Sequence, residues 1–408
     1  IRAMSGFTLD TKLSRVPVDP DNVYLDIMTT NVLGNRTEPL PIQFNENRTN
    51  AILDNAGDYC MSVVRFSLDT QTLPVFIPLI DTTGSDPNRT VYYVSLEYNG
   101  DTFEQHIEWI PQNQYLSPPP IGAYPSEQSM ANPYYYAYDY NWIAYLVNNA
   151  LNSCMSSLKA MYNGSYVPPG DITPIAEIPE IQDIIPPTFV YDPTSQSFII
   201  AANKKFFEFF SPTNQPEIKL FFNSQLYELF SSFPALNYGM TDQYKHYQII
   251  FNSSNGANEI SLPNVPEEDD VVQTFIQVIQ ETPTLANLTP VSAIVFTSSM
   301  LPILPEQISS PQIFIEGAHA STGNNANIGQ IITDLESDDG TYKPSIQYTP
   351  TAEYRRISLL SSRPLTHVQL SVYWRNRYGN LIPVTLAGGG SMTCKILFQK
   401  RSSIYNDA

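Results

Sequence analysis

The side chains most able to bind a catalytic metal are few and scattered in this chain. The four histidines are His106, His246, His319 and His367, and no His-Glu-x-x-His or Cys-x-x-Cys spacing occurs. Such spacings place two ligands side by side on one element, which an isolated histidine cannot do. The pattern predicts structural histidines and no catalytic metal site.

An acidic run over 334–340, DLESDDG, is similar to a calcium-binding loop. Asp334, Glu336 and Asp338 stand at alternate positions, as the ligands of such a loop do. The glycine comes one place late, and Ser345 stands where the loop needs a bidentate glutamate. We therefore do not expect an EF-hand, and solvated loops are the simpler interpretation.

Nucleophilic catalysis has one candidate, the glycine-flanked Ser391 in AGGGSMT. This stretch departs from Gly-x-Ser-x-Gly because Thr393 replaces the last glycine, so a turn between strands explains it better. A phosphate-binding Gly-x-x-x-x-Gly-Lys motif is also missing. We expect no enzyme and no cofactor, although a hydrolase whose acid pair is distant in sequence stays open.

A tyrosine cluster is the strongest candidate for a contact surface. It comprises Tyr134, Tyr135, Tyr136 and Tyr138, within a proline-rich connection over 111–138. Tyrosine offers a large amphipathic area at low entropic cost, so the cluster indicates a contact with another subunit or partner. The alternative is that these rings pack back on their own domain.

Charge is distributed unevenly along the chain. The whole chain carries −19, yet residues 341–408 carry nine Lys and Arg against two acids, leaving −26 for the first 340 residues. The candidate basic residues for contact with a partner are Arg355, Arg356, Arg375, Arg377, Lys400 and Arg401. They predict contact with DNA or an acidic neighbour. The alternative is pairing with acids of the same fold.

Cysteine usage and hydropathy bear on the compartment. Cys60, Cys154 and Cys394 are far apart and odd in number, which favours buried free thiols. The chain has no run of eighteen apolar residues and no recognisable signal peptide. We expect synthesis in a host cell without a secretory signal, and no membrane span.

Most of the chain alternates apolar and polar residues, which is typical of strands. Strands are predicted over 23–31, 58–68, 244–251, 272–280 and 291–298, and through the C-terminal block, where Val368, Leu370, Val372 and Trp374 share a face. Hairpins are predicted at Asn99-Gly100 and Asp192-Pro193. A strand running into a short helix is predicted over 217–236, with Asn223 or Ser224 as the helix cap.

One stretch has the period of a helix. Apolar residues recur at three and four over 140–161, with Asp139 or Asn141 as the cap. Many short strands with few helices predict an all-β fold, a jelly-roll antiparallel sandwich with one or two short helices.

Five stretches occur in an order that resembles one family. They are NAILDNAGDYCMSVVRFSLDTQTLPVFIP, NWIAYLVNNAL, FVYDPTSQSFII, FFNSQLYELFSSFP and ISLLSSRPLTHVQLSVYWRNRYGNLIPVTLAGGGSMTCKILFQK. The chain resembles the minor capsid (penton) proteins of Polinton-like viruses, adintoviruses and virophages, over about 20–401. The resemblance implies a jelly roll that forms homo-pentamers at icosahedral vertices of the virion, beside trimers of a major capsid protein.

The resemblance also implies a division into domains and a set of partners. A basal jelly roll would comprise 1–110 and 331–408, with an inserted, largely β second domain over 111–330. Packaged DNA or other internal capsid proteins are candidate partners of the basic end. A major capsid protein and a receptor- or glycan-binding spike remain alternatives, although no Arg-Gly-Asp motif is present.

Overall fold

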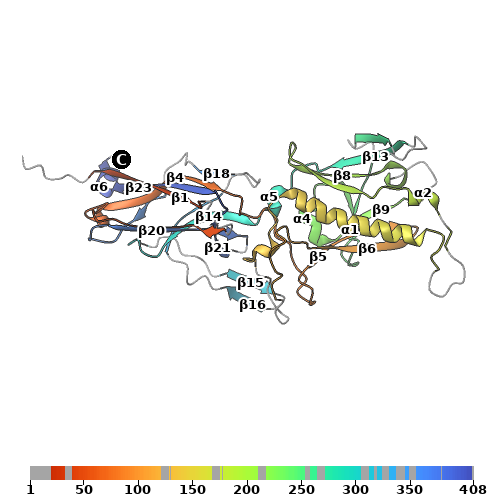
Figure 1. Ribbon diagram of the computed structural model, residues 1–408, viewed down its shortest axis with the longest axis horizontal. Helices are drawn as coiled ribbons and strands as arrows, with labels where there is room; N and C mark the ends of the chain where they lie inside the picture. Colours follow the sequence, from red (N-terminus) through yellow and green to blue (C-terminus); the bar gives the residue numbers. More distant parts are fainter. Residues whose placement is uncertain are drawn as a thin grey trace, which may run out of the picture.

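The computed structural model describes most of the chain. The described residues are 20–32, 39–120, 128, 130–167, 175–176, 178–209, 217–252, 258–263, 272–304, 312–316, 319–323, 330–336, 345–348, 355–377 and 379–406. Two bodies follow one another along the long axis of the molecule (Figure 1). One is a two-sheet sandwich at the end that carries the C-terminus, here called the base, and the other is the insertion.

The base consists of two antiparallel sheets. The first has the order β1 (Asn22–Thr30), β23 (Ser391–Lys400), β4 (Tyr59–Asp69) and β18 (Ser345–Tyr348), with β19 (Ile357–Ser358) also on β4. The second has the order β17 (Gln330–Leu335), β14 (Val291–Ser298), β20 (His367–Asn376) and β21 (Leu381–Pro383), with β3 (Gln43–Asn47) also on β20. Two short pairs flank them: β2 (Leu40–Pro41) with β22 (Thr385–Leu386), and β15 (Gln312–Glu316) with β16 (His319–Gly323).

The order of pairing is that of a jelly roll. Taken along the chain, the eight main strands are β1, β3, β4, β14, β17, β18, β20 and β23. One sheet holds the first, eighth, third and sixth of these, and the other holds the second, seventh, fourth and fifth. Two interleaved four-stranded sheets of this kind define the jelly roll, so the predicted fold class is confirmed.

Alternation in the sequence builds the core of this sandwich. Val368, Leu370, Val372 and Trp374 on β20 are all buried, as are the matching apolar residues of β23. Phe66 of the first sheet meets Phe296 of the second edge to face, with centroids 5.0 Å apart. Each such ring contributes on the order of 1.5–3 kcal/mol by leaving water.

The insertion lies between the third and fourth jelly-roll strands. Its first sheet has the order β10 (Ala235–Asn237), β11 (Tyr247–Ile249), β9 (Lys219–Phe222), β5 (Arg89–Tyr98) and β6 (Asp101–Glu108). Its second has the order β12 (Asn258–Pro263), β13 (Val272–Ile279), β8 (Ser197–Asn203) and β7 (Thr188–Asp192). The long helix α1 (Tyr140–Met161) lies across β5 and β6 and contacts β7 (Figure 1).

The helix α1 has the predicted bounds and the predicted cap. The Asp139 carboxylate accepts a hydrogen bond from the Asn141 N–H at 2.5 Å, and the apolar stripe is buried. The remaining helices are single turns: α2 (Pro179–Gln182), α3 (Lys204–Phe207), α4 (Tyr227–Phe230), α5 (Leu285–Leu288), α6 (Arg401–Asn406), η1 (Ala56–Asp58), η2 (Pro133–Tyr135) and η3 (Ser224–Leu226). The helix predicted over 140–161 is thus the long helix of the described chain, and the other helical segments are short.

Both predicted hairpins form, and one predicted strand is shorter than expected. Asn99 and Gly100 turn between β5 and β6 with φ of 55° and 91°, which these two residue types tolerate best. The strand predicted over 244–251 shrinks to Tyr247–Ile249. The cause is a turn in which the Asp242 carboxylate accepts the N–H groups of Tyr244 and Lys245.

Strand pairing bears on the predicted division into domains. β5 and β6 share a sheet with β9, whereas β14 shares a sheet with β20. A division by sheets therefore falls near residues 70 and 290. The predicted base of 1–110 and 331–408, with an insertion over 111–330, stays a proposal, and the pairings favour moving both boundaries toward the N-terminus.

Candidate assembly surfaces and the junction between base and insertion

The predicted tyrosine cluster lies within the protein. Tyr134, Tyr135 and Tyr136 are 3%, 4% and 5% exposed, and Tyr138 is half-buried. Their hydroxyl groups donate to atoms of the same chain: Tyr134 to Asn88 Oδ1 at 2.7 Å, Tyr135 to the Pro87 carbonyl and Tyr136 to the Met130 carbonyl, both at 3.1 Å. The first two bonds tie the connection after β6 to the loop before β5, and the third lies within that connection.

The burial of these rings leaves little surface for another subunit. Burial raises the pKa of Tyr135 and of Tyr138 to about 12, and it also raises the pKa of Tyr136. Tyr136 meets Trp374 of the base edge to face, with centroids 6.1 Å apart. Within one copy the cluster therefore contacts the base through Tyr136. A contact of the cluster with a second copy stays a prediction.

An ion pair crosses the junction. Arg377, directly after β20, donates through Nη1 to Oε2 of Glu228 on α4 at 2.9 Å and to Oε1 at 3.2 Å. Its Nη2 donates to the Asn287 carbonyl, and its backbone N–H donates to the Pro290 carbonyl at 3.2 Å. A planar guanidinium thus links the end of a base strand to two turns of the insertion.

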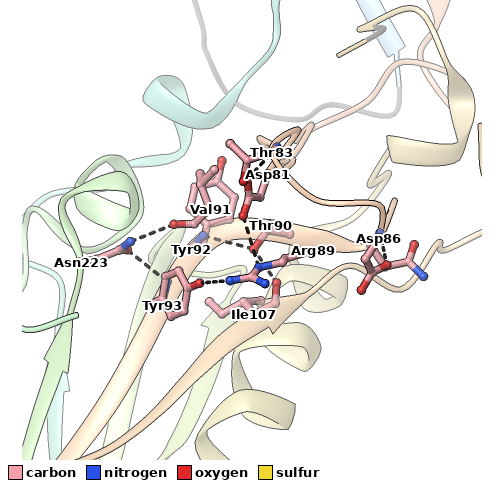
Figure 2. A network of polar contacts seen from close by, with 11 residues as sticks. Asp81, Thr83, Asp86, Arg89, Thr90, Val91, Tyr92, Tyr93, Ile107 and Asn223 are labelled. Carbon is pink, nitrogen blue, oxygen red and sulfur yellow. Dashed lines mark hydrogen bonds and ion pairs between the residues drawn. The ribbon is translucent and has the colours of Figure 1, made fainter. Parts of the chain in front are cut away.

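A polar network fixes the start of β5 (Figure 2). Arg89 lies 3.3 Å from the Asp81 carboxylate through Nε and donates to the Tyr93 hydroxyl at 3.1 Å. The pKa of Asp81 is lowered, chiefly by the hydrogen bond from the Thr83 hydroxyl, and Arg89 adds to this. The β5–β6 register shifts at this point, and the Thr90 hydroxyl donates to the Ile107 carbonyl across it at 2.5 Å.

Asn223 completes this network from a distant part of the chain. Its Oδ1 accepts the Tyr93 N–H at 3.1 Å and its Nδ2 donates to the Val91 carbonyl at 2.8 Å, as Figure 2 shows. Of the two predicted caps, Asn223 and Ser224, Asn223 stands at the N-cap position of η3, but its side chain makes no capping bond there. The side-chain amide instead bonds the backbone of β5 at Tyr93 and Val91, as the backbone of a neighbouring strand would.

A cavity lies beside the junction. Its volume is about 260 Å³, and its walls come from both bodies. Phe76, Tyr92, Met130 and Leu288 supply apolar wall, and the ion pair of Arg377 with Glu228 lies at its polar side. The cavity thus lies at the junction between base and insertion.

The predicted basic residues divide between several environments. Asp334 on β17 is 9% exposed in its side chain and binds both Arg355 and Arg375, the latter at 3.0 Å between Nη1 and Oδ2. Arg377 binds Glu228, as described above. Three of the six candidate basic residues thus pair with acids of the same fold, as the alternative interpretation of the basic block predicted.

The other three basic residues lie elsewhere in the base. Arg401 donates to the Leu359 carbonyl at 2.7 Å, the Lys400 N–H bonds the Asp21 carbonyl at 2.8 Å, and Arg356 is half-buried before β19. β23 ends at Lys400 and α6 begins at Arg401, and α6 lies at the end of the base remote from the insertion (Figure 1). Arg377 instead binds Glu228 at the junction. A contact of this set with DNA stays a prediction.

The three cysteines are free, and two of them are deeply buried. Burial raises the pKa of Cys154 and of Cys394 to about 12, and Cys60 is half-buried. Within the described part of the chain no three His, Cys, Asp or Glu side chains gather as metal ligands would. Asp334, the first residue of the calcium-like run, is occupied by its two arginines. No helix in the described ranges has the length and apolarity to cross a membrane.

The outer face of the first base sheet carries exposed side chains. Tyr24 and Met28 on β1 are 58% and 68% exposed, and Asp26 between them binds Lys395 at 3.2 Å. With its aromatic and apolar side chains, this face is a candidate assembly surface that the sequence analysis did not single out.

Comparison with known proteins identifies the family. A model of the Sputnik minor capsid protein V18/19 family matches residues 23–400. The chain belongs to this family. Its members are capsid proteins, so the chain is a structural component of the virion capsid rather than an enzyme, as the sequence predicted.

Curated relatives come from one virophage. The structural protein V19 of Sputnik virophage is 27% identical over 219 residues, which are 53% of this chain and 94% of that protein. The uncharacterized protein V18 of Sputnik virophage is 33% identical over 146 residues, which are 35% of this chain and 87% of that protein. Both agree with the minor capsid family.

Solved structures share the fold over almost the whole chain. A chain of the Sputnik virophage structure, solved by cryo-EM, matches with a TM-score of 0.74 and 26% identity, covering 94% of this chain and 99% of that one. The mavirus penton protein matches with a TM-score of 0.56 and 17% identity, covering 93% and 99%. The second likeness concerns the fold alone.

Proposed function

We propose that this minor capsid protein is the penton, which forms homo-pentamers at the five-fold vertices of an icosahedral capsid. The observation that carries the proposal is a single eight-stranded jelly roll with a large insertion after its third strand. The likeness in fold to the mavirus penton protein, which extends over 93% of the chain, supports the proposal. A five-fold ring requires heterologous contacts, and a base with two different sides can supply them.

The strand order argues against the role of a major capsid protein. A double jelly roll needs two sandwiches of eight strands each, whereas the described strands build one such sandwich. The insertion consists of two smaller sheets with α1 across them, and its strand order differs from that of the base. The trimers of the major capsid protein are, in this proposal, the partners that surround the pentamer.

The basic residues of the base suggest which end points inward. Lys400 ends β23 and Arg401 begins α6, which lies at the end remote from the insertion (Figure 1). We propose that this end faces the particle interior, where packaged DNA or another acidic component can meet it. The insertion would then extend outward, away from the packaged genome.

A particle reconstruction tests this proposal. A small tag placed between Gly239 and Met240, in an exposed turn of the insertion, should add density at the outside of the five-fold vertices alone. A matched tag after the last residue, next to α6, should add density on the inside of the same vertices. Tag density on the capsid facets would contradict the penton role.

A further inference from the structure

The strand β1 forms one edge of the first base sheet. It pairs with β23 along all nine residues, from Asn22 opposite Gln399 to Thr30 opposite Ser391, without a register shift. Among the residues that the structure describes, no strand pairs with its other side. Such an edge presents a row of backbone N–H and C=O groups to any extended chain.

The flanking hydrogen bonds show which residues of β1 face outward. The Asp21 carbonyl accepts the Lys400 N–H at 2.8 Å, and the Asn31 N–H donates to the Gly390 carbonyl at 3.0 Å. Asp21 and Asn31, the two residues next to β1 that bond β23 and its preceding turn, are both odd-numbered. Along a strand, every second residue directs its backbone N–H and C=O groups to the same side. The even-numbered residues of β1 therefore point their N–H and C=O groups away from β23.

This edge lacks the usual protection against strand pairing. Edges are commonly blunted by proline, bulges, shortness or unpaired charges. β1 is nine residues long and regular, and it contains no proline. Its one charged residue, Asp26, is engaged by Lys395 at 3.2 Å and lies 3.9 Å from Arg65. Tyr24 and Met28 beside it are exposed, so the edge is both open and partly apolar.

The opposite edge of the same sheet offers a complement. In the described chain β18 forms this edge beside Phe66–Asp69 of β4, and β19 pairs with β4 further along, at Cys60 and Met61. The β18 residues Ser345–Tyr348 carry no charge, and Gln347 among them is exposed. Each neighbouring pair in the order β1, β23, β4, β18 is antiparallel, so β18 runs opposite to β1. Copies rotated about an axis along the strands would bring β1 of one copy antiparallel to β18 of the next.

We infer that β1 of one copy adds as a strand to the β18 edge of a second copy, so that the first base sheet continues from subunit to subunit. The inference rests on the proposed penton function and names the contact that closes the ring. Two different edges meet, which is the heterologous geometry that cyclic assembly requires. Main-chain hydrogen bonds supply the affinity in such strand addition, and Tyr24 and Met28 supply apolar contact.

Two substitutions at position 28 separate the contribution of the backbone N–H to oligomerisation from that of the side chain. In Met28→Pro the outward N–H is lost while the bonds of β1 to β23 remain, whereas Met28→Ser keeps the N–H and removes the apolar side chain. We expect Met28→Pro to raise the dissociation constant of the oligomer at least about tenfold more than Met28→Ser does. Equal oligomerisation of the proline variant and the unchanged chain would overturn the inference.

A cross-link provides a second readout that does not depend on tolerance of proline. Met28→Cys with Gln347→Cys, in a Cys60→Ser background, should give covalent chains of several copies with a bis-maleimide about 8 Å long. The two edges of one sheet are three strand spacings apart, roughly 14 Å, so the reagent does not link them within a copy. Each single-cysteine variant is the control and should stay uncross-linked.

The outcomes distinguish the inference from the penton proposal. If the unchanged chain forms oligomers but the double-cysteine variant shows no cross-link between positions 28 and 347, the strand addition is overturned and the penton role stands. An unchanged chain that stays monomeric, together with a double-cysteine variant that does not cross-link at micromolar concentrations, would count against both. Cross-linking that climbs to five copies supports both.

Discussion

Arg377, at the end of a base strand, donates to the Glu228 carboxylate on the insertion, with 2.9 Å between Nη1 and Oε2. The same guanidinium also donates to the Asn287 carbonyl beside the ion pair. One side chain of the basic C-terminal block is thus a fixed link between the two bodies. This relationship explains why a basic residue so close to the cavity at the junction is not free to bind an external anion.

The two partners of this link should differ in their contribution to stability. The Glu228 side chain is 58% exposed, so Glu228→Ala should lower the free energy of unfolding by less than about 1 kcal/mol. Arg377→Ala also deprives the Asn287 carbonyl of a donor and should cost about 1–2 kcal/mol. Urea denaturation of both variants measures this, and equal costs would contradict the bridging role of Arg377.

The stability of the fold should depend on both the Oδ1 acceptor and the Nδ2 donor of Asn223. Asn223→Ala leaves the Tyr93 N–H and the Val91 carbonyl without this partner and should cost about 2–4 kcal/mol. Asn223→Asp still accepts from Tyr93, but it replaces the donor to Val91 with a buried carboxylate oxygen, so it should cost at least as much as the alanine variant. Thermal unfolding compares them, and an alanine variant as stable as the unchanged chain would refute this role of the Asn223 side chain.

Glu217 should make the stability of the insertion depend on pH. Burial raises the pKa of this carboxyl from 4.5 to about 7, although Lys219 and the hydrogen bond from Gln248 oppose the effect. Between pH 7 and 4.5 the folded chain then binds more protons than the unfolded chain, so this group stabilises the fold as the pH falls. The contribution is complete below pH 4.5 and is lost as the pH rises through 7.

The test for Glu217 is the change of Tm with pH. Glu217→Gln should weaken the rise in Tm between pH 8 and 5.5 by on the order of 1–3 °C, since the group is half-buried. Glu97→Gln is the control: burial alone would raise the pKa of Glu97, but hydrogen bonds from Lys219 and Lys245 outweigh it and lower the pKa. An undiminished slope in the Glu217 variant would contradict the assignment.

The thiols should differ in reactivity. Because burial raises the pKa of Cys154 and Cys394 to about 12, both stay protonated and shielded near pH 8. A maleimide should therefore modify about one thiol of the native chain, Cys60, and all three in denaturant. Mass spectrometry of the labelled chain counts them, with Cys60→Ser as the control that should remain unlabelled. Rapid modification of Cys154 would show that α1 does not stay packed on its sheet.

The base was largely predictable from the sequence, for a local reason. Side chains alternate across a strand, so the buried rows of β20 and β23 can be read directly from their residue types. The cap at Asp139 and the turn at Asn99-Gly100 are likewise decided within a few residues. At these positions the geometry depends on neighbours in the chain, and the predicted and observed elements agree.

The junction was not predictable because its contacts join distant segments. Asn223 bonds a strand 130 residues away, and no local pattern distinguishes that role from a helix cap. The tyrosine cluster carries the composition of a contact surface, yet its hydroxyl groups find partners in the loop before β5, so the rings lie inside. The basic residues of the C-terminal block likewise do not form one surface, because Asp334 forms ion pairs with two of the arginines.

The central claim is that the chain assembles as a vertex pentamer, and its mass in solution tests this most directly. Light scattering of the purified protein near neutral pH, in moderate salt, should give about five times the 45.9 kDa of one chain. A stable trimer over the same range of concentration would contradict the account and favour a major capsid or spike role.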